Sequence, residues 1–261
     1  MRVAIAGYGD MGKLIHKLLL AADQTNQESS DIYIIDPNYE NAEFKKITQL
    51  TSQLADVVID FTVPSSAIEN IKHYADIKLA AIIGTTGWYD SIPEVATIVE
   101  KANSKLLWSS NFSIGVNAYF KIVKSAAEVF NSFEDYDVWA YELHHKNKAD
   151  SPSGTAKTLA ELLLKNLERK NKVIYDKLDR KPMQDELHFS SIRGGDVNFE
   201  HTIAFDSEVD SILIKHSARN RLGYAQGAIK AANWLLQQKP GFYGFNDFMQ
   251  DVLTNSNWRE K

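Results

Sequence analysis

Short apolar runs alternate with longer amphipathic segments along the first part of the chain. RVAIA (2–6) has the pattern of a buried strand. After it, apolar residues recur at helical spacing on one face, at Met11, Leu14, Ile15, Leu18 and Leu19. A polar loop is predicted at residues 24–30, and further apolar runs follow as IYIID (32–36), VVIDF (57–61), LAAII (79–83) and KLLWS (105–109), with helical segments between them. Continuous apolar strands separated by helices predict a parallel sheet that is covered on both faces.

Turn-forming residues are expected at or just beyond the ends of these strands. They are Pro64, Gly84, Gly87, Pro93 and Asn111. Open parallel sheets bind their ligands at the carboxyl ends of the strands. The sequence therefore predicts a binding site along that edge of the sheet.

The pattern changes after Asn111. A helical stripe runs from Val116 to Phe130, a strand is expected at 137–143, and a second amphipathic helix shows one apolar face between Ala156 and Leu167. The remaining elements are expected as strands near 187–193, at 199–206 and at 209–216, and as a last helix at roughly 221–238. The short acidic turn SEV between the last two strands predicts an antiparallel hairpin. The charged segment LERKNKVIYDKLDRK (167–181) is interpreted as a solvated connector.

These elements predict an α/β protein of two domains. The first is a Rossmann-like, parallel-sheet dinucleotide-binding domain formed by residues 1–112 together with 220–261. The second is a smaller α+β domain formed by residues 113–219. With 261 residues the chain is long enough for two such cores.

The composition limits the classes of partner that we expect for this protein. Hydrophobic residues make up 44% of the chain and charged residues 24%, as in soluble globular proteins. The formal charge of −5 gives no reason to expect a nucleic-acid partner, because that binding requires a basic surface. The chain has no cysteine, its start makes a poor signal peptide, and no apolar stretch approaches the ~18 residues of a membrane span. We therefore expect a cytoplasmic protein with no membrane partner.

The loop GYGDMG (7–12) lies between the first strand and the first amphipathic helix. In this context Gly7 permits a tight turn, Gly9 lets the backbone approach a pyrophosphate, and Gly12 allows close packing of helix on strand. Asp10 and Met11 open the helix, whose positive end would face the phosphates. Asp36, at the end of the second strand, could accept hydrogen bonds from the adenosine ribose. The alternative is a plain tight turn with Asp36 capping a loop, but the order of elements favours a nicotinamide dinucleotide, and favours it over a flavin.

Two further turns could contact the same cofactor. Gly84, Thr85 and Thr86 leave the fourth strand with small side chains that could press against a flat ring. Ser110, Asn111 and Phe112 leave the fifth strand and offer amide and hydroxyl groups. Each turn alone is more often an ordinary loop. The prediction that they contact the cofactor therefore depends on their sharing a cleft with the glycine loop.

The stretch ELHHKNKADSPSGTA (142–156) concentrates titratable groups after a predicted strand. His144 and His145 should point to opposite sides. A histidine can donate a proton near neutral pH, and Lys148 supplies a positive charge or a second proton donor. Ser153, Gly154 and Thr155 lead into a helix whose positive end could hold a carboxylate or phosphate. A surface loop with a helix cap is the plainer alternative. A zinc site is disfavoured, since neighbours on a strand diverge and the sequence suggests no third ligand.

This stretch closely resembles the signature of the 4-hydroxy-tetrahydrodipicolinate reductase (dihydrodipicolinate reductase) family of lysine and diaminopimelate biosynthesis. The resemblance continues in the glycine loop, DFTVPS (60–65), GTTGW (84–88), SSNFSIGVN (109–117) and SIRGGDVNFEHTIAF (191–205). It implies NAD(P)H-dependent reduction, with loss of water, of a cyclic imine dicarboxylate. It implies His144 as the general acid and Lys148 as the residue that assists protonation and binds substrate.

The resemblance has further implications for the substrate, the cofactor and the assembly. It assigns the substrate carboxylates to His145 with Ser153, Gly154 and Thr155. It also implies that a helix containing Arg221 returns to the cofactor domain and that a homotetramer assembles through the second domain, which would also bind the substrate.

The chain departs from the family pattern at two places. Its glycine loop is one residue shorter than the GxxGxxG form, and Asp36 is followed by Pro37 and Asn38 where many members carry a cation for the 2′-phosphate of NADPH. We therefore expect NADH to be used at least as well as NADPH, unless Lys13, Lys45 or Lys46 folds back toward the ribose. Other functions left open are another two-domain nicotinamide oxidoreductase, such as an amino-acid or sugar dehydrogenase, and a non-catalytic dinucleotide-sensing regulator.

Overall fold

The computed structural model describes residues 1–26 and 31–254, and its contacts divide the chain into two compact units. Unit 1 consists of Met1–Ile114 and Leu222–Lys261, and unit 2 of Gly115–Arg221. Unit 1 is therefore built from both ends of the chain.

Unit 1 contains a six-stranded sheet in the order β11-β5-β4-β3-β1-β2. The strands are β1 (Val3–Ala6), β2 (Ile32–Ile35), β3 (Val57–Asp60), β4 (Ala80–Ile83), β5 (Lys105–Trp108) and β11 (Gly241–Gly244). All neighbouring strands are parallel, which confirms the predicted parallel sheet. Every residue of β1, β3 and β4 is buried, as a sheet with two covered faces requires.

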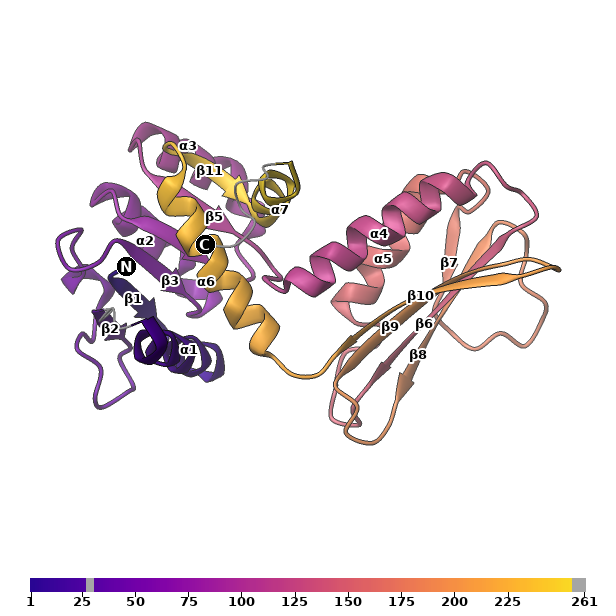
Figure 1. Ribbon diagram of the computed structural model, residues 1–261, viewed down its shortest axis with the longest axis horizontal. Helices are drawn as coiled ribbons and strands as arrows, with labels where there is room; N and C mark the ends of the chain where they lie inside the picture. The colour runs from indigo at the N-terminus through magenta and orange to yellow at the C-terminus, as the bar shows by residue number, and fades with distance from the viewer. Residues whose placement is uncertain (27–30, 255–261) are drawn as a thin grey trace. The chain divides into compact units, whose positions relative to one another are not determined.

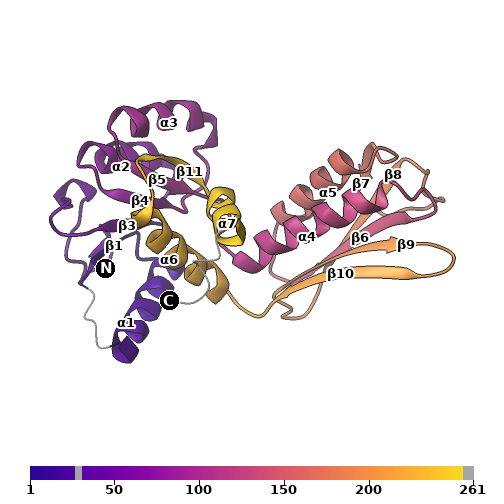
Figure 2. The same ribbon diagram turned by 45° about the horizontal axis from the view of Figure 1, so that its top comes forward.

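Helices cover both faces of this sheet. Figure 2 shows α2 (Pro64–Asp76) and α3 (Ile92–Lys101) on one face and α1 (Asp10–Asn26) and α6 (Leu222–Gln237) on the other. Apolar residues of α2 and α3 pack with those of the central strands in one continuous core. Pro64 begins α2 at a strand end as expected, but Pro93 lies in the first turn of α3, so its predicted place at a strand end is wrong. Proline is tolerated there because the first helical amides have no partner within the helix.

Three features of unit 1 differ from the sequence prediction. α1 continues to Asn26, into the segment predicted as a loop, of which residues 27–30 lie outside the described part of the chain. The last predicted helix is α6, which begins at Leu222, so Arg221 precedes the helix and does not lie in it. After α6 the chain forms β11, which pairs with β5, and then α7 (Phe245–Thr254), neither of which was predicted. β11 is only four residues long with glycine at both ends, so its sequence carries little strand signal.

Unit 2 contains a five-stranded mixed sheet in the order β10-β9-β6-β8-β7. The strands are β6 (Asp137–His144), β7 (Lys172–Ile174), β8 (Glu186–Arg193), β9 (Phe199–Asp206) and β10 (Ser211–Ala218). β9 and β10 are antiparallel, which confirms the predicted hairpin, with its second strand two residues later than expected. β6 pairs with β9 in the antiparallel sense and with β8 in the parallel sense.

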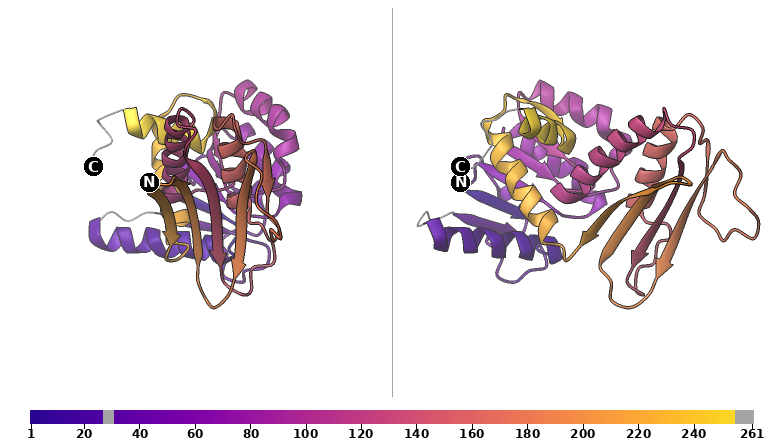
Figure 3. Two further views of the ribbon diagram at one scale, coloured as in Figure 1. Left: turned by 90° about the vertical axis from the view of Figure 1, so that its right-hand side faces the viewer. Right: turned by 45° about the vertical axis from the view of Figure 1, so that its right-hand side comes forward.

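Two helices cover one face of the second sheet. These are α4 (Ile114–Phe130) and α5 (Gly154–Asn166), which lie side by side on the same side of the strands in Figure 1 and in the right-hand view of Figure 3. Their apolar faces form a core with inward-facing residues of β6, β8 and β9. β6 alternates accordingly: Val138 and Ala140 are buried, whereas Trp139 is 37% exposed on the opposite face.

The charged segment 167–181 is more ordered than a solvated connector, so that interpretation is wrong in part. It contributes β7 to the edge of the sheet, and Lys170 is only 3% exposed. The Lys170 ammonium lies 2.6 Å from Asp137 Oδ1 and donates to the carbonyl oxygens of Gln184 and Glu186, each at 2.8 Å. Sequence could not show this, because the two carbonyls come from a segment 14 to 16 residues away.

We expect Lys170→Met to lower the free energy of unfolding by about 2 kcal/mol or more, because it leaves the buried carbonyl group of Glu186 and the part-buried one of Gln184 without their donor. Methionine keeps most of the apolar stem, so the change isolates the ammonium. Urea unfolding followed by circular dichroism measures the effect, with Lys165→Met on the exposed side of α5 as the control. A loss within ~0.5 kcal/mol of the control would contradict the role of Lys170.

Candidate active site

The glycine loop forms a cradle between β1 and α1. Gly7 has φ of +84°, and a Cβ atom there would lie 2.5 Å from the Phe61 carbonyl oxygen. A Cβ on Gly12 would lie 2.1 Å from the Gly7 carbonyl oxygen. At Gly9, by contrast, no described atom comes within 4 Å of the place a Cβ would take. The outer two glycines are thus required by the turn and the middle one faces open space, which fits the approach of a pyrophosphate.

Asp36 directly follows β2 and accepts three backbone amides. Its Oδ2 accepts from Tyr8 N at 2.7 Å, and its Oδ1 accepts from Asn38 N at 2.7 Å and Tyr39 N at 3.1 Å. Burial alone would raise the pKa of Asp36, but these amides and the nearby Lys45 lower it, so the side chain is a carboxylate at neutral pH. Oδ2 retains a lone pair that could accept from a ribose hydroxyl.

A cavity of about 690 Å³ lies beside this carboxylate, within unit 1. The segments after β1, β2 and β3 line it, through Gly7 and Gly9, Asp36 to Asn38, and Phe61 to Val63 respectively. β1 stands between β2 and β3 in the sheet, so the chain reverses its direction of winding at this point, where open α/β sheets bind ligands. Lys45 and Lys46 also line the cavity, and the Lys45 ammonium donates to the carbonyl groups of Tyr39 and Glu40.

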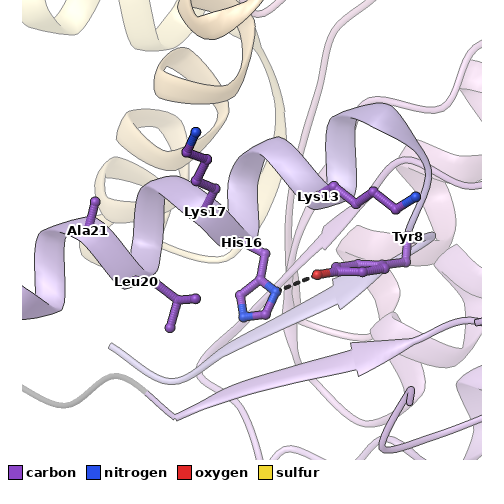
Figure 4. Close-up of a pocket in the computed structure, with 6 residues that line it drawn as sticks. All are labelled: Tyr8, Lys13, His16, Lys17, Leu20 and Ala21. Carbon is purple, nitrogen blue, oxygen red and sulfur yellow. Dashed lines mark hydrogen bonds between the residues drawn. The ribbon is translucent and has the colours of Figure 1, made fainter. Parts of the chain in front are cut away.

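A second, smaller pocket of about 460 Å³ lies along α1 (Figure 4). The Tyr8 hydroxyl and His16 Nδ1 are 2.6 Å apart there, and Lys13, Lys17 and Leu20 are further lining residues. Tyr8 connects this pocket to the larger cavity, because its amide donates to Asp36. Of the three lysines named from the sequence, Lys45 and Lys46 thus lie in the cavity with Asp36, and Lys13 lies in the neighbouring pocket.

The predicted cofactor residues outside the glycine loop divide into buried and exposed groups. Thr85 is 4% exposed, donates to Asp60 Oδ1 at 2.8 Å and accepts from Thr62 N, so its hydroxyl belongs to the turn itself. Phe112 is 2% exposed and packs against Phe61 and Phe245.

The other predicted cofactor residues keep more solvent contact. Thr86 and Ser110 are exposed, while Gly84 and Asn111 are half-buried. At the helix start Asp10 is exposed and Met11 half-buried, and Arg221 is exposed at the end of unit 2.

In unit 2 the carboxylate of Glu142 lies at the centre of a buried polar cluster. Glu142 is 0% exposed, and its Oε1 accepts from Ser153 N at 3.0 Å, Ser191 Oγ at 2.7 Å and Arg193 Nη2 at 2.7 Å. Burial by itself would raise the pKa of Glu142, but the nearby imidazole of His201 and the hydrogen bonds from Ser153, Arg193 and Ser191 hold it far below its usual range. Glu142 is therefore an anion at neutral pH.

The pairing of the strands explains why these side chains meet. Glu142 on β6 stands opposite His201 on β9 and Ser191 on β8, and His144 stands opposite Arg193. Residues two apart on a strand share a face, so Glu142 and His144 both face the helices. Three strands far apart in the sequence thus contribute to one cluster.

His144 is 2% exposed and its Nδ1 lies 3.5 Å from Glu142 Oε2. Burial lowers the pKa of His144 to about 4; Glu142 acts in the opposite direction, and His201, Arg193 and Lys148 lower it further. His144 is therefore neutral at pH 7 unless a bound anion stabilises its protonated form.

The neighbours of His144 lie just beyond the end of β6. His145 is half-buried, in contrast to the buried His144, and its Nδ1 has no hydrogen-bond partner within the described ranges. Lys148 is 23% exposed at its side chain and its ammonium lies 2.5 Å from Asp150 Oδ1, a contact that lowers the pKa of Asp150. The imidazole of His144 thus lies beside the buried carboxylate, and the ammonium of Lys148 lowers the pKa of that imidazole from the loop after β6.

The start of α5 completes this group. Ser153 caps the helix, since its Oγ accepts from Ala156 N at 3.1 Å, and its own amide is bound to Glu142. Gly154 is exposed with open space where a Cβ would stand, and Thr155 is half-buried. Both functional groups of Ser153 are therefore used within the fold, which leaves the amides of Gly154 and Thr155 as the donors for a carboxylate.

Sequence reasoning did not indicate the grouping of Glu142, Ser191, Arg193 and His201. Glu142, His144 and His201 offer atoms within 4.8 Å of one another, and together they form a group of residues that could hold a metal ion. One Glu142 oxygen is already saturated by Arg193 and two neutral donors, so a hydrogen-bonded cluster describes the site better. The two-residue spacing of Glu142 and His144 on a predicted strand was the available signal, but only the pairing of β6 with β8 and β9 adds the rest.

Comparison with known proteins connects both units to one family. The N-terminal model of dihydrodipicolinate reductases matches residues 1–112, and the C-terminal model matches residues 115–249. The 4-hydroxy-tetrahydrodipicolinate reductase of Christiangramia forsetii is 34% identical over 98% of this chain and 100% of that protein, and that of Archaeoglobus fulgidus is 37% identical over 96% and 100%.

The fold agrees with a solved structure. The dipicolinate-bound dihydrodipicolinate reductase from Paenisporosarcina sp. TG-14 has a TM-score of 0.76 at 22% identity, covering 95% of this chain and 98% of that one. In the described part of the chain no helix is both long and apolar enough to span a bilayer. On the matches to both domain models and the full-length relatives, the chain belongs to the dihydrodipicolinate reductase family.

Proposed function

We propose that this protein reduces 4-hydroxy-tetrahydrodipicolinate to tetrahydrodipicolinate with NAD(P)H and loss of water, in lysine and diaminopimelate biosynthesis in the cytoplasm. The observation that carries the proposal is the match of both domain models to consecutive ranges of one chain. The cluster of Glu142, His144 and Lys148 supports it, because this reaction requires a proton donor and a cation beside a dianionic substrate.

His144 is proposed as the general acid and Lys148 as the residue that assists protonation and attracts the substrate. A bound nicotinamide would supply hydride to the conjugated double bond of the imine. As negative charge develops toward the ring nitrogen, a nearby cation and proton donor stabilise the transition state more than the ground state. His145, Ser153, Gly154 and Thr155 are proposed to orient the substrate carboxylates, with Ser153 acting by fixing the start of α5. The open amides at the start of α5 support this assignment for Gly154 and Thr155.

The cofactor is proposed to bind unit 1 at the glycine loop, with the pyrophosphate over Gly9 and the ribose at Asp36. The cavity beside Asp36 supports this arrangement. Gly84, Thr85, Thr86, Ser110, Asn111, Phe112 and Arg221 are proposed as its further neighbours. Asp36 repels a 2′-phosphate, whereas Lys45 and Lys46 attract one, so we propose that NADH is used at least as well as NADPH and that NADPH is tolerated.

We propose a homotetramer assembled through the outer face of the second sheet. Trp139, Ala204 and Leu213 stand in register across β6, β9 and β10 on the face opposite the helices. Trp139 is 37% and Leu213 56% exposed, and Ile192 on β8 is 49% exposed. Such a row of exposed apolar side chains on a sheet face is typical of a surface that a second copy covers.

A spectrophotometric assay coupled to a synthase that supplies the unstable substrate tests the main proposal. Turnover of this substrate would exclude another two-domain oxidoreductase and a dinucleotide sensor at once. Cofactor binding without turnover would favour the sensor, and turnover of an amino acid or a sugar alone would favour another dehydrogenase.

We expect His144→Gln to lower kcat by ~10² or more, since a positioned general acid typically contributes that much.

Lys148→Ala should mainly lower kcat/KM for the substrate. The decrease should correspond to ~2 to 5 kcal/mol, because the substrate carboxylates lose their cation. Steady-state kinetics of both variants give these values, and dissociation constants for NADH should stay near those of the unaltered protein.

The control for this pair is Lys146→Ala, which removes an exposed lysine from the same loop and should change neither quantity by more than about twofold. Normal turnover in folded His144→Gln would remove that residue from the acid role. Unchanged KM and kcat in Lys148→Ala would contradict the proposed role of Lys148 in binding the substrate and assisting protonation.

For the cofactor, we expect kcat/KM with NADH to equal or exceed that with NADPH at low ionic strength, where phosphate attraction to a lysine is least screened. Lys46→Ala should lower the NADPH value severalfold, by about 1 kcal/mol, and leave the NADH value unchanged. Lys101→Ala, on α3 in the same unit, is the control. A tenfold preference for NADPH would contradict the proposed role of Asp36.

For the assembly, Trp139→Glu should convert the tetramer into smaller species, because it places a charge in the proposed interface. Val129→Glu alters an equally apolar, 57% exposed residue on α4 and should leave the assembly intact. Sedimentation velocity of both variants decides the matter. A tetramer that survives Trp139→Glu but not Val129→Glu would move the interface to the helical side.

A further inference from the structure

Glu142 is a buried carboxylate to which the proposed reaction assigns no step. Its surroundings come from three strands and the start of α5, and every close neighbour is a hydrogen-bond donor or an imidazole. An isolated buried carboxylate is costly, so its place next to His144 calls for a physical reason.

The two oxygens of Glu142 are in different situations. Oε1 accepts from Ser153 N, Ser191 Oγ and Arg193 Nη2, which occupies both of its lone pairs. Oε2 is buried and meets no hydrogen-bond donor of good geometry in the described part of the protein. Because the three donors fix Oε1, they also fix the direction in which Oε2 points.

Oε2 points toward two imidazoles. His201 Nε2 lies 3.3 Å away and also has Ser153 Oγ at 3.2 Å as a partner. His144 Nδ1 lies 3.5 Å away and, like Oε2, is buried with no hydrogen-bond partner among residues 1–26 and 31–254. A shift of a few tenths of an ångström would satisfy both orphaned atoms, and leaving them unpaired would cost about 1 to 3 kcal/mol each. The bond that satisfies both is Nδ1–H of His144 donating to Oε2.

Charged and titratable groups face His144 from every neighbouring element. Glu142 and Lys148 belong to β6 and the loop after it, Arg193 to β8, and His201 to β9, whose register partner on β10 is His216. Among these groups Glu142 is the anion, and it opposes the cations around the imidazole. Phe199, the register partner of His144, adds an apolar ring at 5.7 Å.

We propose that Glu142 is a positioning residue: it holds the proton of neutral His144 on Nδ1, keeps Nε2 as the nitrogen that exchanges a proton with the substrate, and favours the imidazolium form. The catalytic consequence of this inference rests on the proposed function. The position of the proton on His144 does not depend on it. The same pairing of a carboxylate with a histidine Nδ1 orients the imidazole in other proton-transfer sites. Lys148 and Arg193 then act as neighbours that keep the imidazole neutral until an anionic substrate arrives.

Glu142→Gln provides a sharp test because the direction of the amide is dictated by its surroundings. Three donors surround the Oε1 position, so the Gln carbonyl oxygen must lie there and the NH₂ group must face His144 Nδ1. That NH₂ group donates to Nδ1 and forces the proton of the imidazole onto Nε2. We therefore expect the tautomer of His144 to invert.

The measurement is ¹⁵N NMR of histidine-labelled protein without substrate at pH 7 to 8, where a protonated nitrogen and a bare one have distinct chemical shifts. His144→Gln assigns the signals. The unaltered protein should show the proton of His144 on Nδ1, and Glu142→Gln should show it on Nε2. In kinetics, kcat/KM at pH 7 should fall at least tenfold, and the limb that falls with rising pH should move to lower pH by about one unit or more, because loss of the anion lowers the proton affinity of His144.

Glu186→Gln is the matched control. Glu186 is a buried glutamate on the same sheet that is also held by an arginine, with Arg180 Nη2 2.7 Å from its Oε1, and its removal should cost comparable stability. It should leave the tautomer of His144 and the pH profile unchanged.

Each outcome has a definite meaning. His144 protonated on Nε2 in the unaltered protein would overturn the proposal, even if Glu142→Gln fails to fold. An unchanged tautomer in folded Glu142→Gln would also overturn it and reduce Glu142 to a structural role. If the unaltered protein does not turn over the substrate, the proposed function fails, while the NMR result still decides the role of Glu142.

Discussion

A carboxylate buried at the end of a strand must be surrounded by donors, and each unit of this protein is organised around one. In unit 1, Asp60 at the end of β3 is 0% exposed and accepts from Thr62, Thr85, Asn70 and Tyr74. In unit 2, Glu142 plays the same part near the end of β6. Because leaving such a group without donors would cost several kcal/mol, the loops that supply the donors are held in place.

This constraint connects packing with the candidate site. The turn after β4 is held to the turn after β3 through Thr85 and Asp60, and both turns lie at the carboxyl ends of parallel strands. In unit 2 the same principle ties the start of α5 to β6, since the amide of Ser153 is bound to Glu142. Fixed loops are what a site needs to keep its donors in place without reorganisation. The polar clusters are therefore part of the packing that fixes these loops.

The titratable groups at the two candidate sites are in different charge states. Asp36 is a stabilised carboxylate that lines a cavity together with Lys45 and Lys46, so groups of both signs face the same space. At His144, burial and the neighbours Arg193, Lys148 and His201 lower the pKa of the imidazole and Glu142 raises it, so the imidazole stays neutral in the unbound protein.

The sequence by itself determined the elements whose pattern is local. Apolar runs separated by amphipathic helices predicted the parallel sheet, the glycine spacing predicted the turn before α1, and the SEV turn predicted the hairpin of β9 and β10. Only the tertiary structure decided what depends on contacts between distant segments. β11 is a strand because β5 offers it an edge, Lys170 is buried because carbonyls of a later segment reach it, and Glu142 meets Ser191, Arg193 and His201 through the register of three strands. Periodicity reports which face of an element is buried, but it carries no information on which other element covers that face.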